Sequence, residues 1–67
     1  MTPYRQAASY RGRDFVVTFS GRTAILVQSV SPVTGDYRTV WKEGRAMGDL
    51  TRAAIGNARM RDSRDDR

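Results

Sequence analysis

The chain has 67 residues, carries a net charge of +5 and contains neither cysteine nor histidine. A single small domain of this length buries only about 60% of its unfolded surface, and without Cys or His it can have no disulfide and is not expected to hold structural zinc. The same inventory lacks the usual acid–base and nucleophilic side chains, so we expect a protein that is not an enzyme and uses no cofactor and no metal.

The N-terminal residues show no clear hydrophobic period, and we expect residues 1–12 to form an arm with at most one short helical turn. A strand is predicted at residues 13–20, because β-branched and aromatic residues fill this segment. Alternation along the strand places three large side chains on one buried face: Phe15, Val17 and Phe19.

Turn signals separate the next two predicted strands. Gly21, which tolerates a positive φ, marks a tight hairpin turn before the strand expected at residues 23–31. That strand is apolar on both faces, so the pattern leaves its register open. Pro32 and Gly35 mark a longer turn, and a third strand is predicted at residues 37–42.

A helix is predicted near residues 48–60, with Asp49 as its N-cap. Small residues are frequent in its apolar stripe, which would let the helix lie close to a sheet: Met47, Leu50, Ala54 and Ala58, with Ile55 at the edge. The mixed-charge segment at residues 61–67 is expected to be a disordered tail.

The expected order is therefore β-β-β-α. This is an α+β fold in which one C-terminal helix packs on a three-stranded antiparallel sheet within residues 13–60, with Trp41 in the core. A small SH3-like barrel with a terminal helix is the alternative. The element order is similar to that of plant ethylene-response-type DNA-binding domains and of the N-terminal domains of some tyrosine integrases. A likeness of element order alone does not carry function.

The positive charge is almost entirely arginine. Eleven of the twelve basic residues are Arg, and residues 1–60 hold the whole excess of positive charge. Arginine makes planar, bidentate contacts with phosphate and carboxylate that lysine cannot match. Codon usage in a GC-rich genome also raises arginine content, so the charge by itself identifies no partner.

The candidate binding residues occupy strand edges, turns and one helix face, where they would contact nucleic acid or an acidic partner: Arg11, Arg13, Arg22, Arg38, Lys42, Arg45, Arg52 and Arg59. Tyr10 and Tyr37 are candidate aromatic contacts for unpaired bases. In the sharpest form of this hypothesis, the helix-free face of the sheet enters a DNA major groove. The side chains that would then make the contacts are Arg13, Arg22, Arg38 and Lys42, with Thr18 and Thr39 beside them.

The composition favours two functions from different classes. The first is a small, non-catalytic nucleic-acid-binding or regulatory protein of the kind found in phages and other mobile elements. The alternative is a small inhibitor or adaptor that binds an acidic or nucleic-acid-binding site on a larger host protein. Either protein is expected to be cytoplasmic, without membrane attachment, and both readings are compatible with a homo-oligomer.

Overall fold

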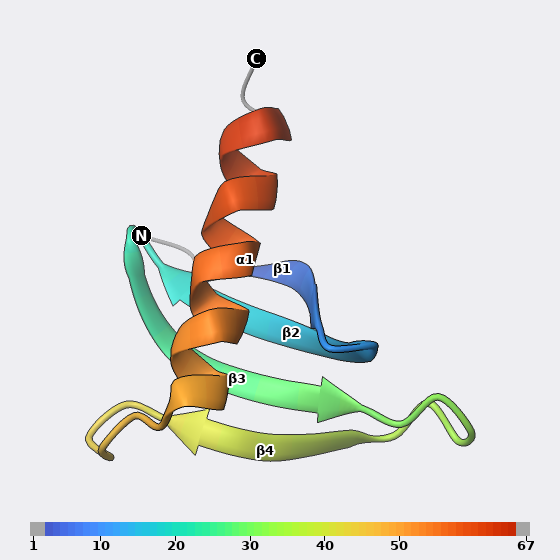
Figure 1. The fold of residues 1–67 in the computed structure, drawn as a ribbon. Helices are drawn as coiled ribbons and strands as arrows, with labels where there is room; N and C mark the ends of the chain where they lie inside the picture. The colour runs from blue at the N-terminus through green and yellow to red at the C-terminus, as the bar shows by residue number, and fades with distance from the viewer. Residues whose placement is uncertain (1–2, 66–67) are drawn as a thin grey trace.

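A computed structural model describes the backbone of residues 3–65 and the side chains of residues 3–61. Four antiparallel strands and one C-terminal helix make up the fold (Figure 1). Each strand pairs with the next along the chain, and the two edge strands do not pair with each other, so the sheet is open. The elements are β1 (Tyr4–Tyr10), β2 (Arg13–Ser20), β3 (Thr23–Val30), β4 (Tyr37–Lys42) and α1 (Asp49–Asp65).

The α+β class and the C-terminal helix are confirmed, whereas the expected number of strands is wrong. The sheet has four strands rather than three, in the order β1-β2-β3-β4. The SH3-like barrel is also wrong, because the sheet stays open. Strand β1 lies in the segment that we expected to be an arm. With four strands before the helix, the element order no longer matches the DNA-binding domains to which the β-β-β-α order was similar.

The sequence of β1 does not show a clear alternation of apolar and polar residues. Its helix-facing positions include Ala8 in place of a large apolar side chain, and alanine is depleted in strands. Ala8 is nevertheless only 2% exposed, because α1 packs against this strand. A tight turn then joins β1 to β2, with positive φ at both Arg11 (52°) and Gly12 (75°). Positive φ at both central residues is the geometry of a type I′ hairpin.

The predicted inward face of β2 is confirmed. Three of its side chains are almost completely buried: Phe15, Val17 and Phe19. Strand β3 contributes Ala24 and Val27 to the same core. These two residues face the same side because the pairing of β2 with β3 shifts register between residues 18 and 19, which leaves one residue of β3 as a bulge. The bulge settles the register that the apolar pattern left open.

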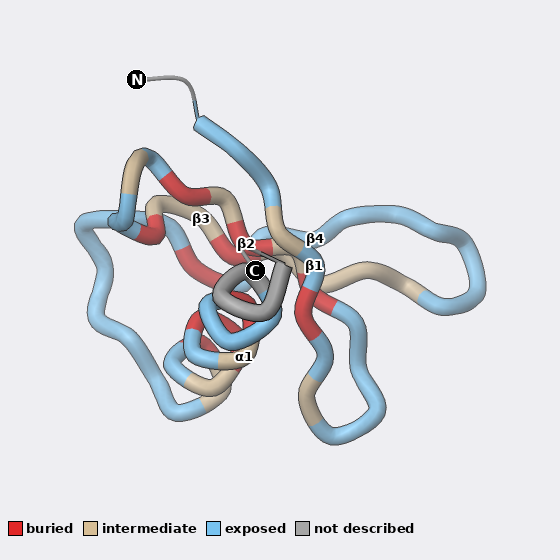
Figure 2. The backbone as a smooth tube through the Cα atoms, turned by 90° about the horizontal axis from the view of Figure 1, so that it is seen from above, coloured by how far each residue is buried: buried red, intermediate tan, exposed pale blue. Residues whose placement is uncertain are grey.

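Helix α1 crosses the strands on one face of the sheet, from β4 near its N-terminal end to β1, and extends beyond β1 (Figure 1). The buried stretches of the strands gather around the helix (Figure 2). The expected stripe is confirmed for Ala54 and Ala58, which are fully buried, while Leu50 is partly buried. Thr51 and Ile55 complete the buried helix face, whereas Met47 precedes the helix and is exposed.

Both ends of α1 differ from the prediction. The Gly48 carbonyl accepts a hydrogen bond of 3.1 Å from the Arg52 N–H, so Gly48 rather than Asp49 is the N-cap. Asp49 lies in the first turn, where its negative charge interacts favourably with the positive end of the helix dipole. The helix continues to Asp65, through part of the segment that we expected to be disordered. The side chains of residues 62–67 and the backbone of residues 66–67 lie outside the described residues.

Trp41 lies in the core, as expected, with 6% of its surface exposed. Its indole N–H donates a hydrogen bond of 2.8 Å to the Arg45 carbonyl. This bond satisfies the polar atom of a buried aromatic side chain. It also ties the connection between β4 and α1 to the end of the sheet.

Replacing Phe19 by alanine should destabilise the protein by about 3–5 kcal/mol, because it removes a large side chain from a closely packed core. A domain this small should lie at the low end of the usual range of about 5–15 kcal/mol for unfolding. We therefore expect the variant to be mostly unfolded, as measured by urea titration and thermal melting with circular dichroism.

The matched control is Val33→Ala in the turn between β3 and β4, where the side chain is 90% exposed. This substitution should leave the melt unchanged. A cooperative Phe19→Ala melt close to that of the wild type would contradict this account of the core.

Candidate nucleic-acid interface

One end of the sheet gathers basic residues that lie far apart in the sequence. The turn between β2 and β3 presents Arg22. The end of β4 lies beside the start of β3, because Lys42 pairs with Leu26 and the Glu43 N–H donates to the Ile25 carbonyl at 3.0 Å. Arg22 and Lys42 therefore share one end of the sheet.

Helix α1 reaches the same end through Arg59. Its Nη2 donates a hydrogen bond of 3.2 Å to the Arg22 carbonyl, and its guanidinium carbon lies 5.9 Å from the Phe19 ring centroid. Arg52 precedes Arg59 by about two helical turns on the same flank. The Arg45 N–H donates to the Lys42 carbonyl at 3.3 Å, which places Arg45 beside β4. We call this group the Arg22 end: Arg22, Lys42, Arg45, Arg52 and Arg59.

A hollow of about 300 Å³ lies within the Arg22 end, between α1 and the start of β3. Ala24 and Ile55 give it an apolar lining, and Arg52 and Arg59 border it from the helix. We call it the Gly56 hollow, after the glycine between the two arginines. Among the described residues no carboxylate lines it; the lining residues are Thr23, Ala24, Met47, Arg52, Ile55, Gly56 and Arg59.

Acidic neighbours do not neutralise the Arg22 end. Among residues 3–61, the acidic residues next to this group in the sequence are Glu43 and Asp49, in the connection and the first turn of α1. Within residues 3–61 no acidic side chain forms an ion pair with a basic one. Within residues 3–61, five basic groups stand against two carboxylates here, and an excess of positive charge favours anionic partners.

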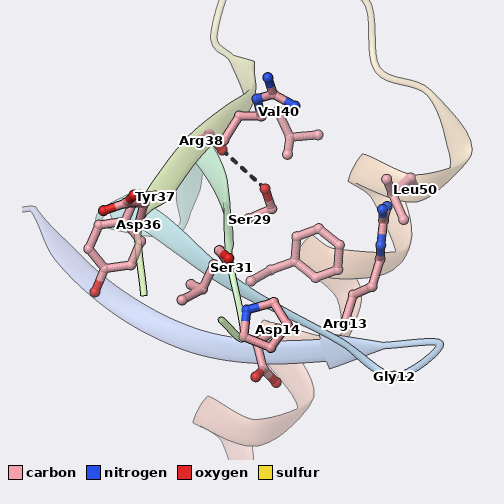
Figure 3. A pocket seen from close by; sticks show the side chains of 13 residues that line it. Gly12, Arg13, Asp14, Ser29, Ser31, Asp36, Tyr37, Arg38, Val40 and Leu50 are labelled. Carbon is pink, nitrogen blue, oxygen red and sulfur yellow. Dashed lines mark hydrogen bonds between the residues drawn. The ribbon is translucent and has the colours of Figure 1, made fainter. Parts of the chain in front are cut away.

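The opposite end of the sheet has mixed charge. The β1–β2 and β3–β4 turns border a larger hollow there, of about 680 Å³. Arg13 and Arg38 line it together with Asp14 and Asp36. Figure 3 shows that the Arg13 side chain extends toward Leu50, whereas the Arg38 side chain takes a different direction. An anion at this end would meet carboxylates as well as arginines, so the Arg22 end is the better anion site.

The four contact residues expected for a DNA groove do not share one face of the sheet. Arg38 pairs with Ser29, and Ser29 pairs with Phe15. Paired residues lie on the same face of a sheet, so Arg38 projects on the helix side, as does Arg13 in alternation with Phe15. The other two residues belong to the Arg22 end. The set therefore does not form one contact surface on the helix-free face, and the contact of its members with nucleic acid stays a prediction.

Both candidate aromatic contacts are engaged by arginines of the chain itself. The guanidinium carbon of Arg5 in β1 lies 5.5 Å from the ring centroid of Tyr37 in β4. This contact joins the two edge strands across the helix-free face, which requires the sheet to curl strongly. The Arg11 guanidinium carbon lies 5.4 Å from the Tyr10 ring centroid. A base could stack on either tyrosine only after its arginine moved.

The sequence pattern identifies the arginines one at a time but not the contacts that assemble them. Arg59 and Arg22 are 37 positions apart, and no local signal links a hairpin turn to that helix flank. Met47 and Gly56 are absent from the predicted site residues, although both line the hollow. In the sequence Gly56 looks only like a weak point of the helix.

Comparisons with protein families, characterised proteins and solved structures find no match to this chain. Within the described residues, no group of three or more His, Cys, Asp or Glu side chains is arranged to hold a metal ion. In the same part of the chain, no helix has both the length and the apolar character needed to cross a membrane. The functional interpretation therefore depends on the charge and shape of the Arg22 end.

The substitution Arg59→Ala should lower the free energy of unfolding by about 1 kcal/mol, because it removes the hydrogen bond to the Arg22 carbonyl. The contact with the Phe19 ring is lost as well. The matched control is Arg52→Ala, which removes the same charge from the same helix flank. The Arg52 side chain makes no such bond within the described residues, so we expect a change within about 0.5 kcal/mol.

Urea unfolding of the two variants against the wild type measures the difference. Equal stabilities for Arg59→Ala and Arg52→Ala would show that the Arg59 contact does not hold the helix to the β2–β3 turn.

Proposed function

We propose that this protein binds nucleic acid without catalysis and holds the phosphate backbone at the Arg22 end. One observation carries the proposal. Arg52 and Arg59 border a hollow that no carboxylate of the described residues lines, and Arg59 bonds the backbone carbonyl of Arg22, which brings the exposed arginine of the β2–β3 turn to the same end. An arrangement of this kind supports anion binding at a defined place rather than a general excess of charge.

The chemistry of the group fits phosphate. A guanidinium group donates two parallel hydrogen bonds to phosphate oxygens from one planar fork. The basic groups extend over a turn, a strand end, a connection and a helix flank. That spread fits a polymer with one negative charge per unit better than a single small anion. The lack of His and Cys also fits binding rather than chemistry.

A protein partner is the second candidate, and the free edge of β4 favours it. This strand pairs only with β3, and its residues are exposed from Tyr37 through Val40. The backbone groups along such an edge can pair with a strand of another chain. The other edge is less free, because the Asn57 Nδ2 donates a hydrogen bond of 2.8 Å to the Ser9 carbonyl. An inhibitor or adaptor would use the β4 edge.

The affinity for nucleic acid should fall steeply with salt, because each neutralised phosphate releases counterions. The substitution Arg22→Ala should make the log–log salt slope shallower by about one, if this guanidinium neutralises one phosphate. The variant keeps the Arg22 carbonyl, so the hydrogen bond from Arg59 is retained. Fluorescence anisotropy with labelled duplex DNA, single-stranded DNA and RNA measures the slope.

The matched control is Arg38→Ala, which removes one exposed arginine from the opposite end and should leave the slope almost unchanged. If the two substitutions change the salt slope equally, binding depends on the net charge of the protein and not on the Arg22 end. If none of the three nucleic acids binds even at ~50 mM salt, far below physiological screening, the nucleic-acid function is refuted. A stoichiometric protein retained in a pull-down would then favour the inhibitor or adaptor.

A further inference from the structure

The Gly56 hollow has a shape that phosphate contacts alone do not require. Phosphates need only basic side chains at a surface, whereas this open hollow also has apolar residues in its lining, Ala24 and Ile55. Its volume of about 300 Å³ lies at the small end of ligand sites, which span about 300–1,000 Å³. A nucleobase is a small planar group with two apolar faces, so it matches both the size and the lining.

Gly56 lies between two arginines on one helix flank. Arg52, Gly56 and Arg59 are spaced four and three residues apart, so they follow one another along a single stripe of the helix. Guanidinium planes stack on unpaired bases, and their N–H groups donate to phosphate oxygens. Arg59 is already bonded to the Arg22 carbonyl and lies over the Phe19 ring, so the group available to stack on an inserted base is Arg52, while the remaining N–H groups of Arg59 can donate to a neighbouring phosphate.

Neither the backbone nor the packing requires glycine at position 56. A Cβ atom added to Gly56 would meet no neighbouring atom within 4 Å, and this glycine does not have a positive φ. Glycine inside a helix costs about 1 kcal/mol relative to alanine. A larger side chain would stand between the two arginines, so glycine keeps the hollow open at the expense of helix stability.

We infer that the Gly56 hollow takes up one unstacked base of a single-stranded nucleic acid. The inference rests on the proposed function and specifies its substrate class. A base inside a duplex is stacked and paired and cannot enter a recess between a helix and a sheet. Single strands therefore bind more tightly than duplexes. Every base has an apolar face, so the sequence preference is weak.

The test fills the hollow without changing any charge. Gly56→Leu places a helix-compatible apolar side chain where the structure has open space. The binding of labelled oligothymidine should weaken about 10-fold, the scale of one lost base-stacking contact, while the salt slope and the affinity for duplex DNA stay unchanged. Gly56→Ala separates helix stability from filling: it should raise the melting temperature and weaken oligothymidine binding less than Gly56→Leu does, because its side chain is smaller.

The outcomes separate this inference from the proposed function. If Gly56→Leu binds oligothymidine like the wild type, the hollow takes no base and the inference is overturned, while phosphate binding stands. An equal loss for oligothymidine and duplex DNA also overturns it, because filling the hollow would then have disturbed the whole surface. If the wild-type protein binds no nucleic acid at ~50 mM salt, the proposed function itself fails. If Gly56→Leu loses a bound protein but binds oligothymidine like the wild type, the hollow is a site for that protein and the inference is overturned.

Discussion

The fold depends on how closely α1 lies against β1. The two elements pack against each other, and the core between helix and sheet includes three almost fully buried alanines: Ala8, Ala54 and Ala58. Because these side chains are small, the helix backbone can lie close to the sheet. Phe15 and Phe19 of β2 are buried in the same core. Asn57, which donates to the Ser9 carbonyl at 2.8 Å, fixes where the helix crosses β1. A chain of 67 residues without cysteine has no disulfide to support its core, so close packing of this kind matters more for its stability.

The same crossing determines where the charges lie. Since the helix runs across the strands, one of its flanks faces the β2–β3 turn and the other faces the β1–β2 turn (Figure 1). Arg52 and Arg59 are on the first flank, where Arg59 reaches the Arg22 carbonyl. A helix parallel to the strands would direct these arginines along the sheet and away from the turn. The Arg22 end is thus a consequence of the close packing between α1 and β1.

The parts of the fold that were predictable are those with large side chains. Phe15, Val17 and Phe19 alternate so clearly that one face of β2 follows from the sequence. Strand β1 could not be predicted, because Ala8 has no strand preference of its own and is buried only by a helix that comes much later in the chain. At the site, the charged residues were identifiable individually. The hollow was not, since Gly56 has meaning only once Arg52, Arg59 and the start of β3 surround it.

The two candidate functions use different surfaces of the same small domain. A nucleic-acid strand at the Arg22 end would contact the β2–β3 turn and one helix flank, whereas an added strand would pair along the exposed edge of β4. The charged groups that line the hollow at the opposite end are of both signs, whereas no carboxylate of the described residues lines the Gly56 hollow, so an anionic polymer would meet less repulsion there. Because the surfaces are separate, a substitution such as Arg22→Ala leaves the β4 edge intact. The chemistry of each surface can therefore be tested in a protein that is otherwise unchanged.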